Sequence, residues 1–278
     1  MTNETDLRLP LKHSLTPSYL LALAIALLMS IAAIIGLLFP ETIYPTEEVL
    51  LAFLPVDLFH LVAGLPILLG SMWLARRGKL AGLLLWPGAL LYILYNYVLS
   101  LIGVPFGVLF LPYLLLVPLS AYAAIVLVAS IDTETVAKRL AGNVPRRGAG
   151  VFLVVVTGLF VLMAVGGILG AVASHKEVGR LEQMLWIADL ATISPACLVG
   201  GVLLLLRRPL GYTGGTGLLL AYTMLFFGLV PVMVFTSIYD GSPADIIGLG
   251  MMVALGIISL AFLALFLRGG AKRGSAGF

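Results

Sequence analysis

The stretch from residue 57 to residue 78, DLFHLVAGLPILLGSMWLARRG, decides the fold. It begins with Asp57, continues as an apolar run broken by a histidine and a few small residues, and ends in Arg76 and Arg77. An α-helix rises about 1.5 Å per residue, so about 20 apolar residues cross a hydrocarbon core that is about 30 Å thick. The stretch therefore predicts a membrane-spanning helix.

Seven other runs along the chain have the same character. Of the 278 residues, 61% are hydrophobic and only 10% are charged, whereas a soluble domain has about 25% charged residues. No segment between the runs is long enough to fold as a separate soluble domain. The sequence predicts an all-α, polytopic transmembrane bundle with eight spans, at residues 18–39, 56–75, 80–103, 108–129, 150–173, 185–206, 213–237 and 246–267.

The basic residues are segregated between alternate loops. Fourteen of the 16 Lys and Arg residues form five clusters, which are Arg8 and Lys12; Arg76, Arg77 and Lys79; Lys138, Arg139, Arg146 and Arg147; Arg207 and Arg208; and Arg268, Lys272 and Arg273. The other loops contain only Lys176 and Arg180, together with nine of the 13 acidic residues. Because cytoplasmic loops collect Lys and Arg, we predict that both tails, 1–17 and 268–278, are cytoplasmic.

Composition also excludes several functional classes. The basic pI near 9.0 comes from residues at membrane boundaries, so the expected partner is the lipid bilayer and not nucleic acid. The single cysteine, Cys197, excludes an intrachain disulfide and a CxxC redox pair. HExxH and phosphate-binding Gly-Lys-Thr motifs are absent from the sequence. We predict no cofactor and no metal, and the sequence leaves the oligomeric state open.

The loop at 130–149 contains the signals of a short helix. Asp132 is suited to be an N-cap and Gly142 to be a stop. Such a helix could lie on the inner membrane surface, or it could be a solvated linker between two parts of the chain.

The second half of the chain resembles the first. Asp189-Leu190 begins the sixth span as Asp57-Leu58 begins the second, and an arginine pair ends each of these spans at nearly the same distance along the chain. Both spans also contain a central proline. We predict two parallel four-helix repeats, 18–129 and 150–267, with chance similarity between apolar helices as the alternative.

The two acids are candidate site residues because ionisable groups within a membrane are costly. Asp57 and Asp189 lie about 27–28 Å from the arginines that end their spans, which places them at the outer boundary. Each could be an N-cap that the helix dipole stabilises. Alternatively, if the apolar residues before them also enter the membrane, the two carboxylates line an outward-facing cavity between the halves.

Three further residues are candidates. His60 follows Asp57 by three residues and shares its helix face, so the pair could form a hydrogen bond, relay a proton or contribute to a metal site. Tyr92 and Asn96 lie on one face of the third span, with Ser100 one turn further. An amide in a spanning helix requires a partner, so this face could join two helices or form the polar wall of a ligand cavity.

Three stretches carry a resemblance to known proteins. They are GLPILLGSMWLARRG at 64–78, WPGALLYILYNY at 86–97 and ASID at 129–132. In these stretches the chain resembles a group of uncharacterised prokaryotic integral membrane proteins with eight spans. The resemblance implies a prokaryotic cytoplasmic membrane as the location, and no catalytic or binding role comes with it.

Three functions fit the sequence. The first is a carrier or binder of a small solute or lipid, with its site between the halves. The second is a non-catalytic sensor or assembly subunit, and the third is a membrane-embedded lipid-modifying enzyme that uses His60 and Asp57. The lack of recognisable catalytic motifs favours a protein that is not an enzyme.

Overall fold

The computed structural model describes residues 9–241, 243 and 245–271. Within these residues the fold is all-helical, with eight helical segments that are long and apolar enough to cross a membrane. In chain order the helices are α1 (Thr16–Leu38), α2 (Pro40–Ile43), α3 (Glu47–Phe59), α4 (Leu65–Arg76), α5 (Leu80–Gly103), α6 (Phe110–Ser130), α7 (Thr133–Leu140), α8 (Arg146–Ser174), α9 (Arg180–Ala188), α10 (Ser194–Leu205), α11 (Pro209–Asp240) and α12 (Ile246–Ala271). The transmembrane bundle and its eight spans are confirmed.

Spans 2 and 6 differ from the other six because each is built from three pieces. A π-helical turn, η2 (His60–Gly64), joins α3 to α4, and another, η3 (Asp189–Ile193), joins α9 to α10. Together these pieces form continuous spans at Glu47–Arg76 and Arg180–Leu205. Both spans therefore begin earlier than the predicted residues 56 and 185.

The early start of span 2 has a clear local cause. The hydroxyl of Thr46 accepts a hydrogen bond from the Val49 amide, and Glu47 and Glu48 occupy the first turn, where they favour the helix dipole. Gly179 is the N-cap residue of the other span. Asp57 and Asp189 consequently lie about 15 Å and 14 Å inside their helical spans, and the prediction that they are N-caps is wrong.

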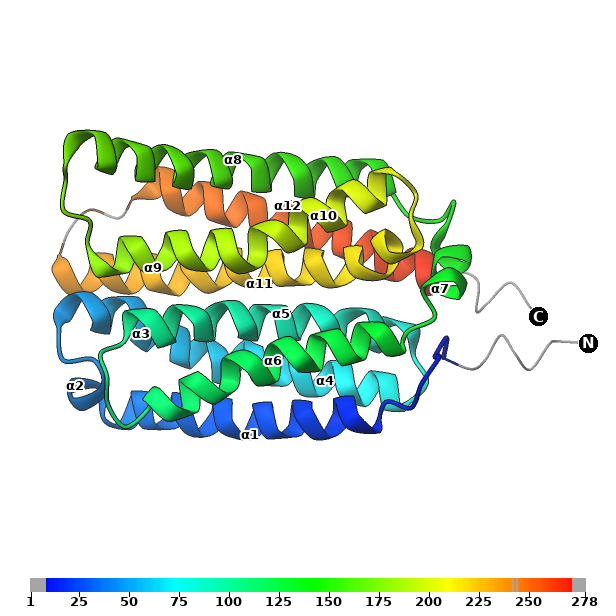
Figure 1. Ribbon diagram of the computed structural model, residues 1–278, viewed down its shortest axis with the longest axis horizontal. Helices are drawn as coiled ribbons and strands as arrows, with labels where there is room; N and C mark the ends of the chain where they lie inside the picture. Colours follow the sequence, from blue (N-terminus) through cyan, green and yellow to red (C-terminus); the bar gives the residue numbers. More distant parts are fainter. Residues whose placement is uncertain (1–8, 242, 244, 272–278) are drawn as a thin grey trace, which may run out of the picture.

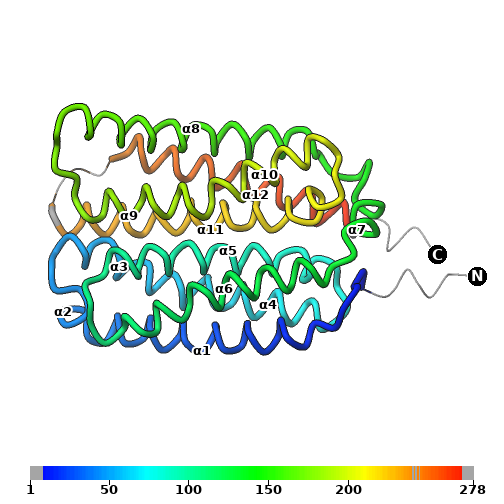
Figure 2. The backbone as a smooth tube through the Cα atoms, viewed as in Figure 1, coloured from blue at the N-terminus to red at the C-terminus, as the bar shows by residue number. Residues whose placement is uncertain are grey.

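The spans form two halves that lie side by side (Figures 1 and 2). Helices α1–α6 form half 1 and α8–α12 form half 2, and in both halves the first helix starts at the end of the molecule where α7 lies. Helices α5 and α11 pack against each other at the centre, while α3 also contacts α11 and α9 contacts α5. Each half therefore reaches across to the central helix of the other.

Helices α5 and α11 meet through their backbones. A Cβ atom at Gly88 would overlap the carbonyl group of Gly217, and one at Gly217 would lie 2.9 Å from the amide nitrogen of Gly88. Small residues allow such close approach between membrane helices. The two glycines thus allow the backbones of the two halves to approach closely at this crossing.

Many features of the two halves recur at one constant separation along the chain. The π-helical turns begin at positions 60 and 189, α4 and α10 at 65 and 194, and α5 and α11 at 80 and 209. Pro66 and Pro195, at the second position of α4 and α10, have the same separation, as do Gly88 and Gly217. This separation is slightly shorter than the one that the acids and arginine pairs predicted, and it aligns Asp189 with His60 instead of Asp57.

The helix ends follow the same separation. Gly78 and Arg207 both adopt a positive φ, of 74° and 59°, just after α4 and α10. The Gly78 and Lys79 amides donate to the carbonyls of Ala75 and Leu74 at 2.9 Å and 3.0 Å. The corresponding amides of residues 207 and 208 donate to residues 204 and 203 at 3.2 Å and 2.9 Å, so both turns close in the same way.

The linker helix predicted within 130–149 is present as α7. The side chain of Asp132 caps it by accepting from the Thr135 amide, and Gly142 follows it with a φ of 82°. Val136 and Leu140 are fully buried, and α7 packs against α11 and α12. Its apolar face therefore contacts the bundle.

The outward faces of the spans are apolar. Side chains such as Leu20, Leu27, Leu162 and Val172 are more than half exposed, as expected for surfaces that contact lipid in an integral membrane protein. The basic residues of the turns after α4 and α10 lie at the same end of the molecule as α7 (Figure 1). The structure describes the predicted tails only from residue 9 and up to residue 271, so Arg8, Lys272 and Arg273 lie outside it.

Candidate ligand-binding site

A cavity of about 370 Å³ lies between the two halves. Its walls come from α3 and α5 of half 1, and from α8, α9, η3, α10, α11 and α12 of half 2. The lining residues of α5 occupy the last half of that helix, and those of α9 belong to the first part of span 6. The cavity thus occupies the part of the bundle that is remote from α7.

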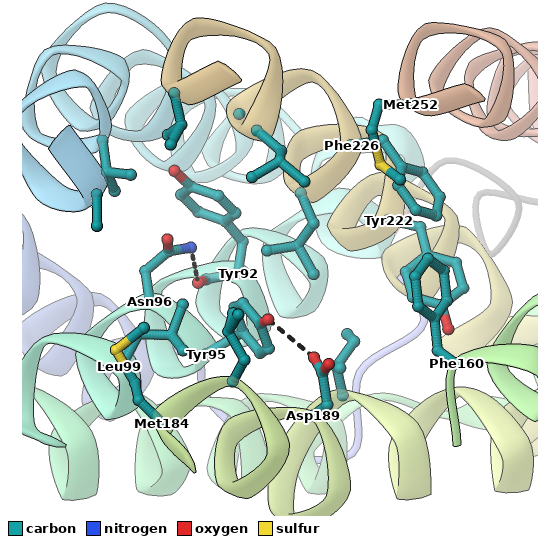
Figure 3. Close-up of a pocket in the computed structure, with 18 of the residues that line it drawn as sticks. Tyr92, Tyr95, Asn96, Leu99, Phe160, Met184, Asp189, Tyr222, Phe226 and Met252 are labelled. Atoms are coloured by element: carbon teal, nitrogen blue, oxygen red, sulfur yellow. Dashed lines mark hydrogen bonds between the residues drawn. The ribbon is translucent and has the colours of Figure 1, made fainter. Parts of the chain in front are cut away.

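The cavity wall is mostly aliphatic and aromatic. The lining residues with polar groups are Tyr92, Tyr95, Asn96, Asp189, Ser194 and Tyr222. In Figure 3 the side chains of Tyr92, Tyr95, Asn96, Asp189 and Tyr222 lie around the open space, with Met252 and Phe226 at one side and Met184 and Leu99 at the other. An apolar cavity of a few hundred Å³ with a few polar groups is typical of small-molecule sites.

One hydrogen bond crosses between the halves at the cavity wall. The Tyr95 hydroxyl of α5 donates to Oδ1 of Asp189 at 2.8 Å (Figure 3). Asp189 is the first residue of the π-helical turn η3, and such turns often occur at functional sites. This carboxylate therefore has a defined orientation toward the space that the two halves enclose.

Asn96 and Tyr92 contribute polar atoms from half 1. The Asn96 amide nitrogen donates to the carbonyl oxygen of Tyr92 at 2.9 Å, one turn earlier in the same helix (Figure 3). The Tyr92 ring lines the cavity, but its hydroxyl is buried and has no partner among the described residues. Asn96 therefore belongs to the cavity wall and is hydrogen-bonded within its own helix.

Asp57 and His60 lie elsewhere. Neither residue lines the cavity. The Asp57 carboxylate accepts a hydrogen bond from the Tyr44 hydroxyl, and it lies against Gly36 of α1, where a Cβ atom would overlap it. Of the five predicted site residues, Tyr92, Asn96 and Asp189 thus share the cavity, whereas Asp57 and His60 belong to the interior of half 1.

Sequence reasoning found Tyr95 among the polar residues of the third span but not its partner, and it missed Tyr222. Tyr95 lies beside the predicted face of α5, and the sequence did not indicate that it bonds to Asp189. Tyr222 lines the cavity from the middle of α11, and its hydroxyl shares a 2.5 Å hydrogen bond with Thr157 of α8. A hydroxyl-bearing aromatic side chain in mid-span was the available signal, because such a group requires a buried partner.

The described residues contain no group of three or more His, Cys, Asp or Glu side chains placed to hold a metal ion. Comparison of the chain with protein-family models, curated proteins and solved structures finds no match. A function for this chain therefore has to be inferred from the cavity and its residues.

Proposed function

We propose that this protein is a carrier or binder of a small, mostly apolar solute or lipid, which occupies the cavity between the halves. The observation that carries the proposal is the cavity itself, with its volume of about 370 Å³ and its walls from both halves. We place the protein in a prokaryotic cytoplasmic membrane with both termini in the cytoplasm, since that orientation puts the basic loops inside. The cavity would then lie toward the outer face.

The wall indicates the chemical class of the ligand. Asp189 receives one hydrogen bond, from Tyr95, and in residues 9–241 no Lys or Arg nitrogen lies within 4.0 Å of its carboxylate. Asp189 is partly buried, and a carboxylate withdrawn from water is costly unless a charge or hydrogen bonds compensate it. A ligand with an apolar body and an ammonium group would bury its body against the aliphatic wall and place its charge at Asp189.

The parallel construction of the halves supports a carrier. We propose that they are a duplication whose register aligns His60 with Asp189, since the π-helical turns, the prolines and the central glycines all follow this alignment. In carriers built from repeats, the substrate site lies between the repeats. The cavity has this location.

The enzyme alternative has less support. It requires Asp57 and His60 to meet Asn96 on an open pocket, but only Asn96 lines the cavity. The alternative of a sensor or assembly subunit predicts a solid bundle with Asn96 paired internally. Asn96 is paired within its own helix, but the cavity of about 370 Å³ favours a carrier or binder.

Ligand binding can be tested by thermal unfolding of the purified protein in lipid nanodiscs. Octylamine, octanol and octanoate share an apolar chain and differ in charge. A ligand that binds the native state stabilises it by about 2.7 kcal/mol at 100 times Kd. We expect octylamine to raise the unfolding temperature most, because its ammonium group is attracted to Asp189, and octanoate least, because its carboxylate is repelled.

Two variants and a matched control test whether the rise in unfolding temperature comes from octylamine bound in the cavity. Leu225→Trp fills the cavity and should abolish the octylamine shift, and Asp189→Asn should reduce the preference for octylamine over octanol. Leu162→Trp, on an exposed face of α8, should change neither the octylamine shift nor the preference for octylamine over octanol. An octylamine shift that is equal in wild type and Leu225→Trp would show binding outside the cavity and would contradict the proposal.

A further inference from the structure

A cluster of polar side chains lies inside half 1, outside the cavity lining. Its members come from the link before α3, from α3 itself, from η2, from α5 and from α6, and they are Tyr44, Asp57, His60, Tyr97 and Tyr113. All five are buried. Such a concentration of ionisable groups within a membrane-spanning bundle requires an explanation.

Asp57 and His60 form the centre of the cluster. Nδ1 of His60 lies 3.9 Å from Oδ1 of Asp57, and His60 is the only basic residue within 4.0 Å of that carboxylate in residues 9–241. This distance is too long for a hydrogen bond, and a shift of about 1 Å would form one. Because an uncompensated buried charge is costly, the pair is expected to hold one proton between its two groups.

His60 has unused hydrogen-bonding capacity. Its exposed fraction is 1%, and neither ring nitrogen has a partner among the described residues. The Tyr97 hydroxyl is also buried without a partner, and the Tyr97 ring stacks on the imidazole with centroids 5.3 Å apart. Buried polar groups are nearly always paired, so several unpaired groups around one carboxylate indicate a site that binds water or protons.

Phenols surround the pair, and among the described residues no Lys or Arg nitrogen lies within 4.0 Å of the Asp57 carboxylate. Tyr44 donates to Asp57, Tyr92 and Tyr97 of α5 contact the imidazole ring, and Tyr113 of α6 packs on Tyr97. Helix α1 presents Gly36, which has no side chain to titrate. Protonation of the pair would therefore change the net charge of this region by one.

Tyr92 connects the cluster to the cavity. Its ring meets the His60 ring edge-on with centroids 5.7 Å apart, and the same ring lines the cavity. A cation in the cavity and the Asp57–His60 pair are thus separated by one aromatic residue within a region of low dielectric, where the cation would disfavour the bound proton and favour the deprotonated, anionic pair.

We propose that Asp57 and His60 form a buried proton-binding site, and that a cationic ligand in the cavity competes with this proton through Tyr92. The second part rests on the proposed function, and the first part does not. The outcome would be an exchange of one proton for one cationic ligand, with the proton released to water.

The proton site can be tested without any ligand. Infrared difference spectra of the protein in nanodiscs, recorded over the pH range in which it stays folded, report the protonation of carboxyl groups. We expect a carboxyl band that is absent in Asp57→Asn and whose midpoint moves in Tyr44→Phe and His60→Gln. Spectra of Asp57→Asn that match those of wild type over this range would overturn the proposal, and the Tyr44→Phe spectra provide the same comparison if Asp57→Asn does not fold.

The link to the cavity is tested with octylamine, which stays protonated at neutral and mildly acidic pH. We expect its thermal shift in wild type to grow as the pH rises and to depend less on pH in His60→Gln, which leaves Asp189 intact. An unchanged pH dependence in His60→Gln would assign the effect to Asp189 and overturn the link. If octylamine does not bind at all, the proposed function and the link fail together, and the infrared result still decides the proton site.

Discussion

At the scale of single residues, the turns after α4 and α10 place a glycine and an arginine in the same backbone conformation, and the two residues differ in the conformational energy that this costs. Gly78 and Arg207 occupy equivalent places and both adopt a positive φ. This left-handed conformation is free for glycine, and it costs about 1–2 kcal/mol for a residue with a Cβ atom. Arg207 therefore carries backbone strain that Gly78 avoids.

Substitutions at these two positions should have opposite effects on stability. Arg207→Gly is expected to raise the free energy of unfolding by about 0.5–1 kcal/mol, and Gly78→Ala to lower it by about 1 kcal/mol. No heavy atom lies within 4 Å of a Cβ at Gly78, so its effect reports the backbone alone. Thermal unfolding in detergent measures both, and a stabilising Gly78→Ala would contradict this explanation.

Asp132 is a second residue whose role can be isolated. Hydrogen bonds from the Thr135 hydroxyl, at 2.6 Å, and from the Thr135 amide lower the pKa of Asp132 below its ordinary value. A carboxyl group with a lowered pKa in the folded state contributes stability above its unfolded pKa of about 3.9, and this stability is lost as the pH falls through the folded value.

Helix α7 should consequently loosen in acid. We expect the hydrogen-exchange protection factors of α7 amides to fall as the pH drops below about 4, because the protonated cap accepts hydrogen bonds less well. Asp132→Asn keeps a good N-cap that does not titrate, so its protection factors should stay constant over the same range. An equal fall in both proteins would assign the loosening to another group.

At the scale of helices, hydrophobic length alone predicted all eight spans and placed span 3 at its observed bounds. It failed at the starts of spans 2 and 6, because acids at positions 57 and 189 resemble helix ends in a sequence. The structure buries Asp57 and partly buries Asp189, and it gives each a tyrosine partner, Tyr44 and Tyr95, from a different element. Hydropathy contains no information on such tertiary pairs.

The crossing of α5 and α11 provides a test of helix packing. Gly88→Ala should separate the two backbones and lower the free energy of unfolding by about 1–3 kcal/mol, because a Cβ there would overlap Gly217. Gly170→Ala is the matched control, since it also lies in a spanning helix and its Cβ would have no heavy atom within 4 Å. Equal stabilities of the two variants would contradict a direct backbone contact at this crossing.

At the scale of the whole molecule, the charge pattern predicts a cytoplasmic location for α7, and this can be measured on intact cells. Cys197 is fully buried, so the wild-type chain gives little background with a membrane-impermeant maleimide. We expect Glu177→Cys, in the loop between α8 and α9, to react from outside. Glu134→Cys, in α7, should react only after the cells are permeabilised, and the reverse result would invert the topology.

The candidate site was only partly predictable. Spacing along one helix placed Tyr92 and Asn96 on a common wall. The acid–arginine distance placed Asp189 at the outer boundary, and the apolar residues before it raised the alternative of a cavity between the halves. The same reasoning paired Asp189 with Asp57, but the structure separates them because Asp57 faces α1 and Asp189 faces α5. Which neighbour a helix face meets depends on how the helices assemble, and a single sequence does not contain that geometry.

The glycine contact between α5 and α11 also has a mechanical consequence. The 370 Å³ cavity begins about one turn beyond this contact, whereas a second cavity of about 230 Å³, between α5, α6, α10 and α11, includes Gly88 and Gly217 in its wall and extends toward α7. This backbone contact lies between the two spaces and would be the pivot of a motion about the α5–α11 crossing, alongside the contacts of α3 with α11 and of α9 with α5. Any rocking of one half against the other would therefore shrink one of these spaces while it enlarges the other.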